Sequence, residues 1–210
     1  MKVLFIYPNT YGMNMLPPAI AMFSAILKNE GHQVQIFDTT YYAIDYGIDS
    51  DGTKVERLNV MPFKMEEKGL RLKTSDWKLD LKKQVNDFKP DLFAISSTED
   101  MWELAMQVLQ ELKDYKIKNN IPVVAGGVFA TFAPEICIKD ELVDLVCVGE
   151  GENALIDLCN KKKHPDYCLC RDITKSKYLK SYLVSNIGIK VPEFVNIPIT
   201  LSFLIIVLFL

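Results

Sequence analysis

Several features that would assign a function class at once are missing from this 210-residue sequence. An excess of positive charge is absent: the formal net charge is -3, so no nucleic-acid partner is expected. No apolar run is long enough for a membrane helix, because the apolar tail at 197–210 has about 14 residues against the roughly 20 required. The apolar start, residues 1–7, is too short for a secretion signal and predicts a first strand.

Cysteine and histidine are scarce. The five cysteines are an odd number without a signal sequence, which favours reduced thiols and a cytoplasmic protein. Cys168 and Cys170 lack the partner spacing of a zinc or cluster site. Cys137, Cys147 and Cys159 lie in predicted helix or strand interiors, where buried inert thiols are expected. We therefore predict neither metal ligands nor catalytic residues.

What is present is a regular alternation of short apolar runs with helical patterns. Helices are expected over residues 19–29, 77–88, 101–118, 134–139 and 153–160. Strands are expected over residues 3–7, 33–37, 92–95, 121–125 and 143–148. The pattern predicts a doubly wound α/β fold, with a parallel five-stranded sheet in the flavodoxin-like order 2-1-3-4-5.

Helix ends and segment boundaries follow from turn chemistry. Gly31 is expected to end the first helix, and Ser75 with Asp76 to cap the second. Hydroxyls at 96–98, followed by acidic residues, are expected to start the third. Residues 39–74 form a long excursion or lid. His32, after a helix-ending glycine, is predicted to face solvent.

The chain divides into a domain at 1–160 and an irregular remainder at 161–210. That remainder is basic and then apolar, and we interpret it as a remnant of a following domain. Membrane contact through the apolar tail is the weaker alternative.

Four loops are expected at the carboxyl edge of the sheet, where open α/β sheets bind ligands. They span residues 9–12, 96–98, 126–131 and 149–152, and they offer hydroxyls, backbone N–H groups and glycines with little charge. Adjacent Gly126 and Gly127 permit a close approach of backbone to a ligand. Glu150 and Glu152 are read as groups that cap the last helix and contact the ligand edge, in preference to an acid–base pair.

Other occupants of this fold match these loops less well. A receiver domain needs acidic residues after the first strand and an aspartate after the third, where this chain has Pro8-Asn9 and Ser96-Ser97. A flavodoxin-type phosphate loop would have only Thr10 and Gly12. Asp38 could hold a ribose, yet no Gly-x-Gly-x-x-Gly follows the first strand.

The sequence resembles the cobalamin-binding domain at the amino terminus of many radical S-adenosylmethionine (SAM) enzymes. The resemblance covers residues 1 to about 158. The matching segments are Tyr7-Pro8-Asn9, Pro17-Pro18, Gly31-His32, Lys89-Pro90-Asp91, Ser96-Ser97-Thr98, residues 126–135 and residues 148–152.

The resemblance implies a corrin ring across the carboxyl edge, with its nucleotide tail in a slot between strands. Gly126 and Gly127 would leave room for the tail, and Ser96 and Thr98 would hydrogen-bond it. The implied cofactor-binding residues are Asn9, Thr10, Tyr11, Gly12, Ser96, Ser97, Thr98, Gly126, Gly127, Val128, Thr131, Gly149, Glu150 and Gly151.

The chain departs from the family pattern at the cobalt ligand. The histidine-ligating subfamily has Asp-x-His-x-x-Gly after the first strand, and this chain has Asn9-Thr10-Tyr11-Gly12. The resemblance thus implies cobalamin with its own base displaced and no protein imidazole, with Tyr11 or an apolar side chain facing the cobalt. Phe129 stands where members of the family often have histidine.

A second departure is the missing Cys-x-x-x-Cys-x-x-Cys motif of radical SAM enzymes. An iron–sulfur cluster and SAM are therefore expected only if a radical SAM domain is supplied by a partner or by a longer chain of which this is a part. Two other classes remain open. One is a flavin- or nucleotide-binding oxidoreductase domain, and the other is a non-catalytic interaction fragment.

Overall fold

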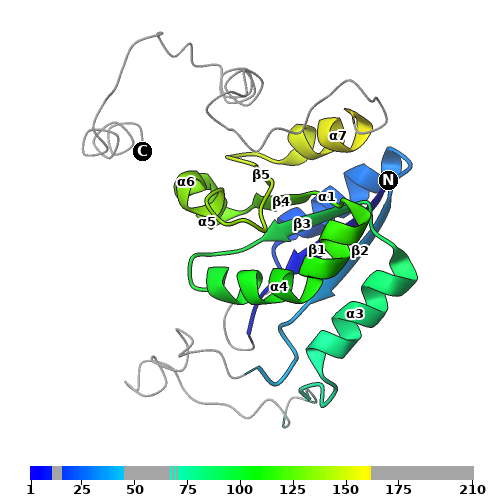
Figure 1. Ribbon diagram of the computed structural model, residues 1–210, viewed down its shortest axis with the longest axis vertical. Coiled ribbons are helices and arrows are strands. Elements are labelled where there is room, and N and C mark those ends of the chain that lie inside the picture. The colour runs from blue at the N-terminus through cyan, green and yellow to red at the C-terminus, as the bar shows by residue number, and fades with distance from the viewer. Residues whose placement is uncertain (11–15, 45–66, 68, 70, 162–210) are drawn as a thin grey trace, which may run out of the picture. The chain divides into compact units, whose positions relative to one another are not determined.

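A computed structural model describes residues 1–10, 16–44, 67, 69 and 71–161 (Figure 1). The predicted tail and domain boundary, and most of the 39–74 excursion, lie outside these residues or at their limit. No helix in the described part of the chain is long and apolar enough to cross a membrane.

The described residues form a parallel sheet of five strands in the order β2-β1-β3-β4-β5, which confirms the predicted fold. The strands are β1 (Lys2–Tyr7), β2 (Gln33–Asp38), β3 (Leu92–Ser96), β4 (Val123–Gly126) and β5 (Leu145–Val146). The last strand is shorter than the predicted 143–148, because the amide of Val143 is bonded in a turn to the carbonyl of Asp140 and the chain leaves the sheet after Cys147.

Helices cover both faces of the sheet, as Figure 1 shows. They are α1 (Pro18–Asn29), α3 (Trp77–Phe88), α4 (Trp102–Asn119), α5 (Val128–Phe132), α6 (Pro134–Cys137) and α7 (Glu152–Lys161). Ion pairs from Lys78 and Lys82 to Glu111 join α3 to α4 on one face.

The core explains why β1 is apolar without interruption. Val3, Phe5 and Tyr7 point to one face and pack in a cluster with Ile20 of α1 and Leu155 of α7. The intervening residues of β1 point to the opposite face and are also fully buried. A strand covered on both faces reads as a continuous apolar run.

Two helix boundaries test the predicted caps. The Asp76 side chain accepts a hydrogen bond from the Lys78 amide at 2.8 Å, and Gly31 has the positive φ of 78° expected after a helix end. The predicted hydroxyl cap of α4 is wrong: its N-cap residue is Met101, and no side chain caps it. The hydroxyls that precede α4 therefore remain available for another role.

The prediction for His32 is wrong as well. This residue is only 4% exposed, and its Nδ1 lies 3.0 Å from the amino group of Met1. The amide of His32 donates to the carbonyl of Leu27, so the chain folds back on the end of α1 and carries the ring into the protein. Cys137 and Cys159 are buried as predicted, and Cys147 is partly buried.

Candidate functional site

The four predicted edge segments come from the carboxyl ends of parallel strands, so they reach the same edge of the sheet. Register pairs Ile6 with Ile95, and Ser96 with Gly126. The predicted site residues lie at or directly after these strand ends: Asn9, Thr10, Ser96–Thr98, Gly126–Thr131 and Gly149–Gly151. Tyr11 and Gly12 were also assigned to the site, and they lie outside the described residues.

The loops after β3 and β4 are joined through their backbones. The amide of Ser97 donates to the carbonyl of Gly126 at 3.4 Å, and the amide of Phe129 donates to the carbonyl of Ser97 at 3.3 Å. Between them Gly127 has φ of 92°, and a Cβ there would lie 3.0 Å from the Oγ of Ser96 and from the backbone of Ser97. The protein's own packing thus requires glycine at 127.

Gly126 is different from its neighbour. A Cβ at this position would meet only the carbonyl oxygen of Ile95 at 3.8 Å and the Cβ of Cys147 at 3.9 Å, which are ordinary contacts. The sequence interpretation gave both glycines one role, clearance for a ligand. The structure separates them: a Cβ would fit at Gly126 without displacing a neighbour, whereas at Gly127 it would not.

Three buried hydroxyls at this edge have no hydrogen-bond partner within the described residues: Thr10, Ser97 and Thr98. Thr10 is 6% exposed and Ser97 is 4% exposed. An unpartnered buried hydroxyl costs roughly 1–3 kcal/mol, so such groups are normally satisfied. The carboxyl edge therefore carries polar groups for which a bound molecule is the natural partner.

The polar groups between β1 and β2 are, by contrast, bonded to one another. The hydroxyl of Thr39 accepts from the amide of Asn9 and donates to its carbonyl, both at 2.7 Å. The Asn9 side chain donates to Thr40, which in turn bonds Asp38. Asn9 thus fixes the end of β1 to the end of β2, and the Asp38 carboxylate has a local partner.

The segment after β5 is attached at two points. The amide of Gly149 donates to the hydroxyl of Thr131 at 3.2 Å, and that hydroxyl donates to the carbonyl of Gly127 at 2.9 Å. At Gly151 a Cβ would lie 3.0 Å from the Phe23 ring of α1. Glu150 lies between these points and is exposed.

Two side chains at this edge, the Tyr7 phenol and the Cys147 thiol, have pKa values above their ordinary range. Burial raises the pKa of the Tyr7 phenol, and the nearby Asp38 carboxylate raises it further. Burial also raises the pKa of the Cys147 thiol, with a smaller contribution from Glu152. No group of His, Cys, Asp and Glu that could hold a metal occurs in the described part of the chain. The described groups of this edge are suited to hydrogen bonding and apolar contact.

One element of the site was missed from sequence. The segment 126–131 was expected to be a loop, but helix α5 begins directly after Gly127. Its Val128 and Phe132, with Ile136 of α6, are 61%, 78% and 56% exposed. Their spacing of four residues was the available signal. On the buried side, Phe129 contacts the Trp102 ring at a centroid distance of 5.3 Å.

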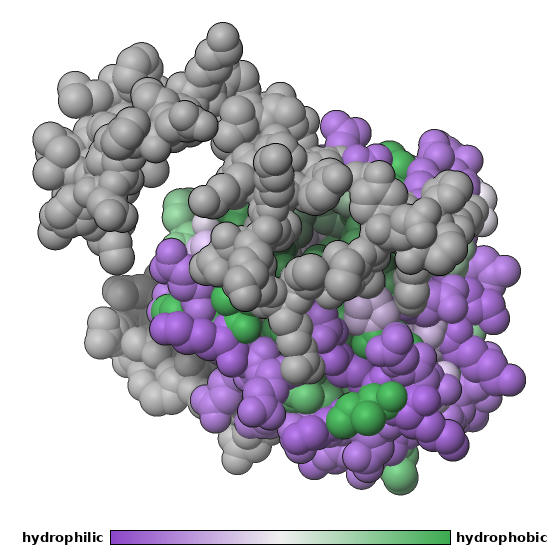
Figure 2. Space-filling view, turned by 45° about the horizontal axis from the view of Figure 1, so that its top comes forward, coloured by the Kyte–Doolittle hydropathy of each residue, from purple (hydrophilic) through white to green (hydrophobic). Residues whose placement is uncertain are grey.

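Figure 2 shows a face that is mostly hydrophilic where it is coloured, with hydrophobic residues in small separate groups.

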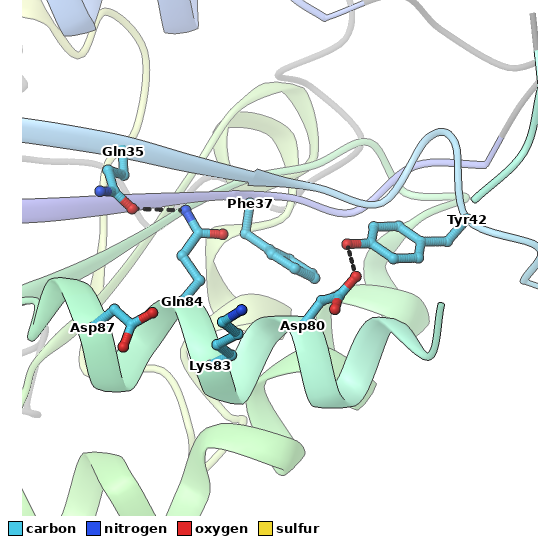
Figure 3. Close-up of a pocket in the computed structure, with 7 residues that line it drawn as sticks. All are labelled: Gln35, Phe37, Tyr42, Asp80, Lys83, Gln84 and Asp87. Atoms are coloured by element: carbon cyan, nitrogen blue, oxygen red, sulfur yellow. Dashed lines mark hydrogen bonds between the residues drawn. The ribbon is translucent and has the colours of Figure 1, made fainter. Parts of the chain in front are cut away.

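A hollow of about 360 Å³ lies elsewhere, between β2 and α3 (Figure 3). Its lining residues are Gln35, Phe37, Tyr42, Asp80, Lys83, Gln84 and Asp87. Its polar groups bond each other: Tyr42 donates to Asp80 at 2.9 Å, and Gln84 donates to Gln35 at 2.9 Å. Burial, with the Asp80 carboxylate, raises the pKa of Tyr42 to about 12. Because its polar groups are bonded to one another, we assign no ligand to this hollow.

Comparison with known proteins bears on which ligand class this edge binds. The family model described as "B12 binding domain" matches residues 66–158. Residues 66–158 of this chain are thus similar to B12 binding domains. The match supports cobalamin as the ligand, in agreement with the resemblance seen in the sequence. The matched range covers β3, β4, β5 and their loops, which include the Ser97 and Thr98 hydroxyls and both glycines.

Two curated relatives carry methyltransferase names. This chain is 28% identical over 136 residues to cytidylyl-2-hydroxyethylphosphonate methyltransferase of Streptomyces wedmorensis. It is 34% identical over 86 residues to the uncharacterized methyltransferase PH0819 of Pyrococcus horikoshii. These matches cover 65% and 39% of this chain, but only 22% and 18% of the two relatives.

Solved structures show the same fold. This chain aligns with the radical SAM methyltransferase TsrM from Kitasatospora setae at a TM-score of 0.55 and 19% identity, over 77% of this chain and 26% of that one. It aligns with the cobalamin-dependent radical SAM enzyme OxsB at 0.51 and 19%, over 77% and 18%. The chain thus spans about a fifth to a quarter of these proteins.

Proposed function

We propose that this domain holds cobalamin across the carboxyl edge of its sheet, with the cofactor's own base displaced and without a histidine ligand to the cobalt. The Thr10, Ser97 and Thr98 hydroxyls carry the proposal. Each is buried without a partner in the described residues, and all three follow β1 or β3 at the edge where open α/β sheets bind ligands. The amide side chains and phosphate of cobalamin offer both donors and acceptors to such hydroxyls.

The slot for the nucleotide tail is assigned to the β3–β4–β5 side of this edge. Gly126 supports this placement because its missing side chain faces only ordinary contacts, so the space beside it is not consumed by packing. Gly127 supports it indirectly, because it brings the Ser97 backbone within hydrogen-bond distance of Gly126. In this arrangement Val128, next to the pair, and Glu150 border the opening.

The absence of a histidine ligand is supported by the position of the histidines. The sequence has two. His32 lies at the amino end of β2, beside Met1, at the opposite edge of the sheet. His164 lies outside the described residues. Tyr11, which the family resemblance implies would face the cobalt, also lies outside the described residues.

We propose further that the domain serves a methyl-transferring radical SAM enzyme. When bound, cobalamin supplies a carrier for a methyl group between SAM and a substrate. The curated relatives with methyltransferase names support this assignment. The cluster-binding Cys-x-x-x-Cys-x-x-Cys motif is not in this chain, so a radical SAM domain would have to be provided by another chain or by a longer form of this one.

Retention of cofactor tests the ligand. The 210-residue chain is mixed with hydroxocobalamin or with flavin mononucleotide, desalted and examined by absorption spectroscopy. Retained cobalamin with a spectrum that lacks histidine ligation is the expected result. Retained flavin would support the flavodoxin-like alternative, retention of neither would support an interaction fragment, and a histidine-ligated spectrum would refute the proposed cobalt environment.

Two substitutions test the contacts. Ser97→Ala and Thr98→Val are each expected to weaken cobalamin binding by roughly 3- to 10-fold, because each removes one hydrogen bond to the cofactor. Neither should lower the free energy of unfolding of the cofactor-free chain, because these hydroxyls have no partner there. Ser24→Ala is the matched control: its hydroxyl bonds the carbonyl of Ile20 within α1, and its loss should leave binding unchanged. Wild-type affinity in both test variants would place the cofactor elsewhere.

A further inference from the structure

The bond between Thr131 and Gly149 gives Thr131 a role different from direct contact with a ligand. Its hydroxyl donates to the carbonyl of Gly127 at 2.9 Å and accepts from the amide of Gly149 at 3.2 Å. One oxygen therefore connects the turn that opens α5 to the turn that follows β5. A serine or threonine hydroxyl can do both, because it has one donor and two acceptor sites.

The segment that this bond holds has little other support. Strand β5 pairs with β4 over only two residues, and its last backbone bond to β4 runs from the Cys147 amide to the Ala125 carbonyl at 2.8 Å. Beyond it, Gly149 has φ of 80° and open space where a side chain would be. The next packed position is Gly151 against Phe23. The 149–151 segment is thus fixed at one end by α1 and at the other by Thr131.

We infer that Thr131 is a positioning residue, which holds the 149–151 segment against the glycine turn so that two sides of the cofactor site keep a fixed separation. This inference rests on the proposed function. It replaces donation from the Thr131 hydroxyl to the cofactor, because the proton of that hydroxyl is already bonded to the carbonyl of Gly127 and one of its two acceptor sites to the amide of Gly149.

The test compares three variants of the full chain. Thr131→Val keeps the shape and removes the hydroxyl, and Thr131→Ser restores the hydroxyl. Ser24→Ala removes another hydroxyl that bonds the carbonyl four residues earlier, but has no link to a second loop. Two quantities are measured: solvent exchange of the Gly149 amide by NMR without cofactor, and the dissociation rate of hydroxocobalamin.

In Thr131→Val the Gly149 amide should exchange roughly 2- to 10-fold faster, the factor that one lost hydrogen bond gives, and cobalamin should dissociate faster by a similar factor. Thr131→Ser should restore both rates, and Ser24→Ala should change neither.

Unchanged Gly149 exchange in Thr131→Val, or faster exchange with unchanged cobalamin dissociation, would overturn the positioning role while leaving the proposed function intact. Failure of the wild-type chain to retain cobalamin would overturn the proposed function itself.

Discussion

The two edges of the sheet treat their polar groups in opposite ways. At the amino edge, the Asp91 carboxylate accepts from the Lys2 amide at 2.8 Å, and the Asp144 carboxylate accepts from the Val123 amide at 2.8 Å. Asp144 also pairs with Lys116 at 2.9 Å. Carboxylates that precede β3 and β5 thus satisfy the first N–H groups of neighbouring strands.

At the carboxyl edge some polar groups, such as Asn9 and Thr131, are bonded within the protein, but other hydroxyls are left without a partner in the described residues. The Ser97 and Thr98 hydroxyls are buried and unbonded within the described residues. Burial without a hydrogen bond lowers stability, so a protein gains nothing from it unless a ligand supplies the partner. We infer that the polar groups of the amino edge stabilise the fold, whereas the unbonded hydroxyls of the carboxyl edge bind a ligand. Substitution of single residues at each edge tests this contrast.

The largest expected effect is on the amino edge. Asp144→Ala should lower the free energy of unfolding by about 2–4 kcal/mol, because it leaves the largely buried Lys116 ammonium and the Val123 amide without their partner. Urea denaturation measures this loss. Asp91→Ala is the milder control, since its bond to Lys2 is exposed. If the folded fraction of Asp144→Ala lost cobalamin affinity, the division between edges would be wrong.

A smaller effect separates the two glycines of the carboxyl edge. Gly127→Ala should cost about 2 kcal/mol, because alanine is unfavourable at positive φ and its Cβ would press on the Ser97 backbone. Gly126→Ala should change stability by less than about 0.5 kcal/mol, since its Cβ meets only ordinary contacts. Denaturant midpoints decide the matter, and equal losses for the two alanine variants would contradict the geometry.

The fold was predictable from sequence because its signals are local. A strand covered on both faces must be apolar throughout, and helices end where glycine or an acidic cap appears. The run from Val3 to Tyr7, Gly31 and the Asp76 cap all followed these rules. The order of the strands then followed from the alternation of strands and helices.

The site was only partly predictable because its decisive features depend on tertiary packing. The sequence places hydroxyls before α4, where a cap is the default expectation, and only the structure shows that Ser97 and Thr98 do not cap the helix. Likewise, adjacent glycines look equivalent in sequence, whereas one φ angle distinguishes Gly127 from Gly126. His32 was misplaced because its burial depends on the return of the chain past Leu27.

The smallest expected effect concerns alkaline pH at the carboxyl edge. Burial and Glu152 raise the pKa of the Cys147 thiol, so the folded protein binds its proton more tightly than the unfolded chain does. The stabilisation is complete below the unfolded pKa of roughly 8.5 and is lost as the pH rises through the folded value. One such group changes the free energy of unfolding by at most about 1.4 kcal/mol per pH unit. In urea titrations at pH 7 to 10, the free energy of unfolding should fall less steeply with pH for Cys147→Ala than for wild type. Identical slopes of the free energy of unfolding against pH would mean that this thiol ionises as freely in the folded protein as in the unfolded chain.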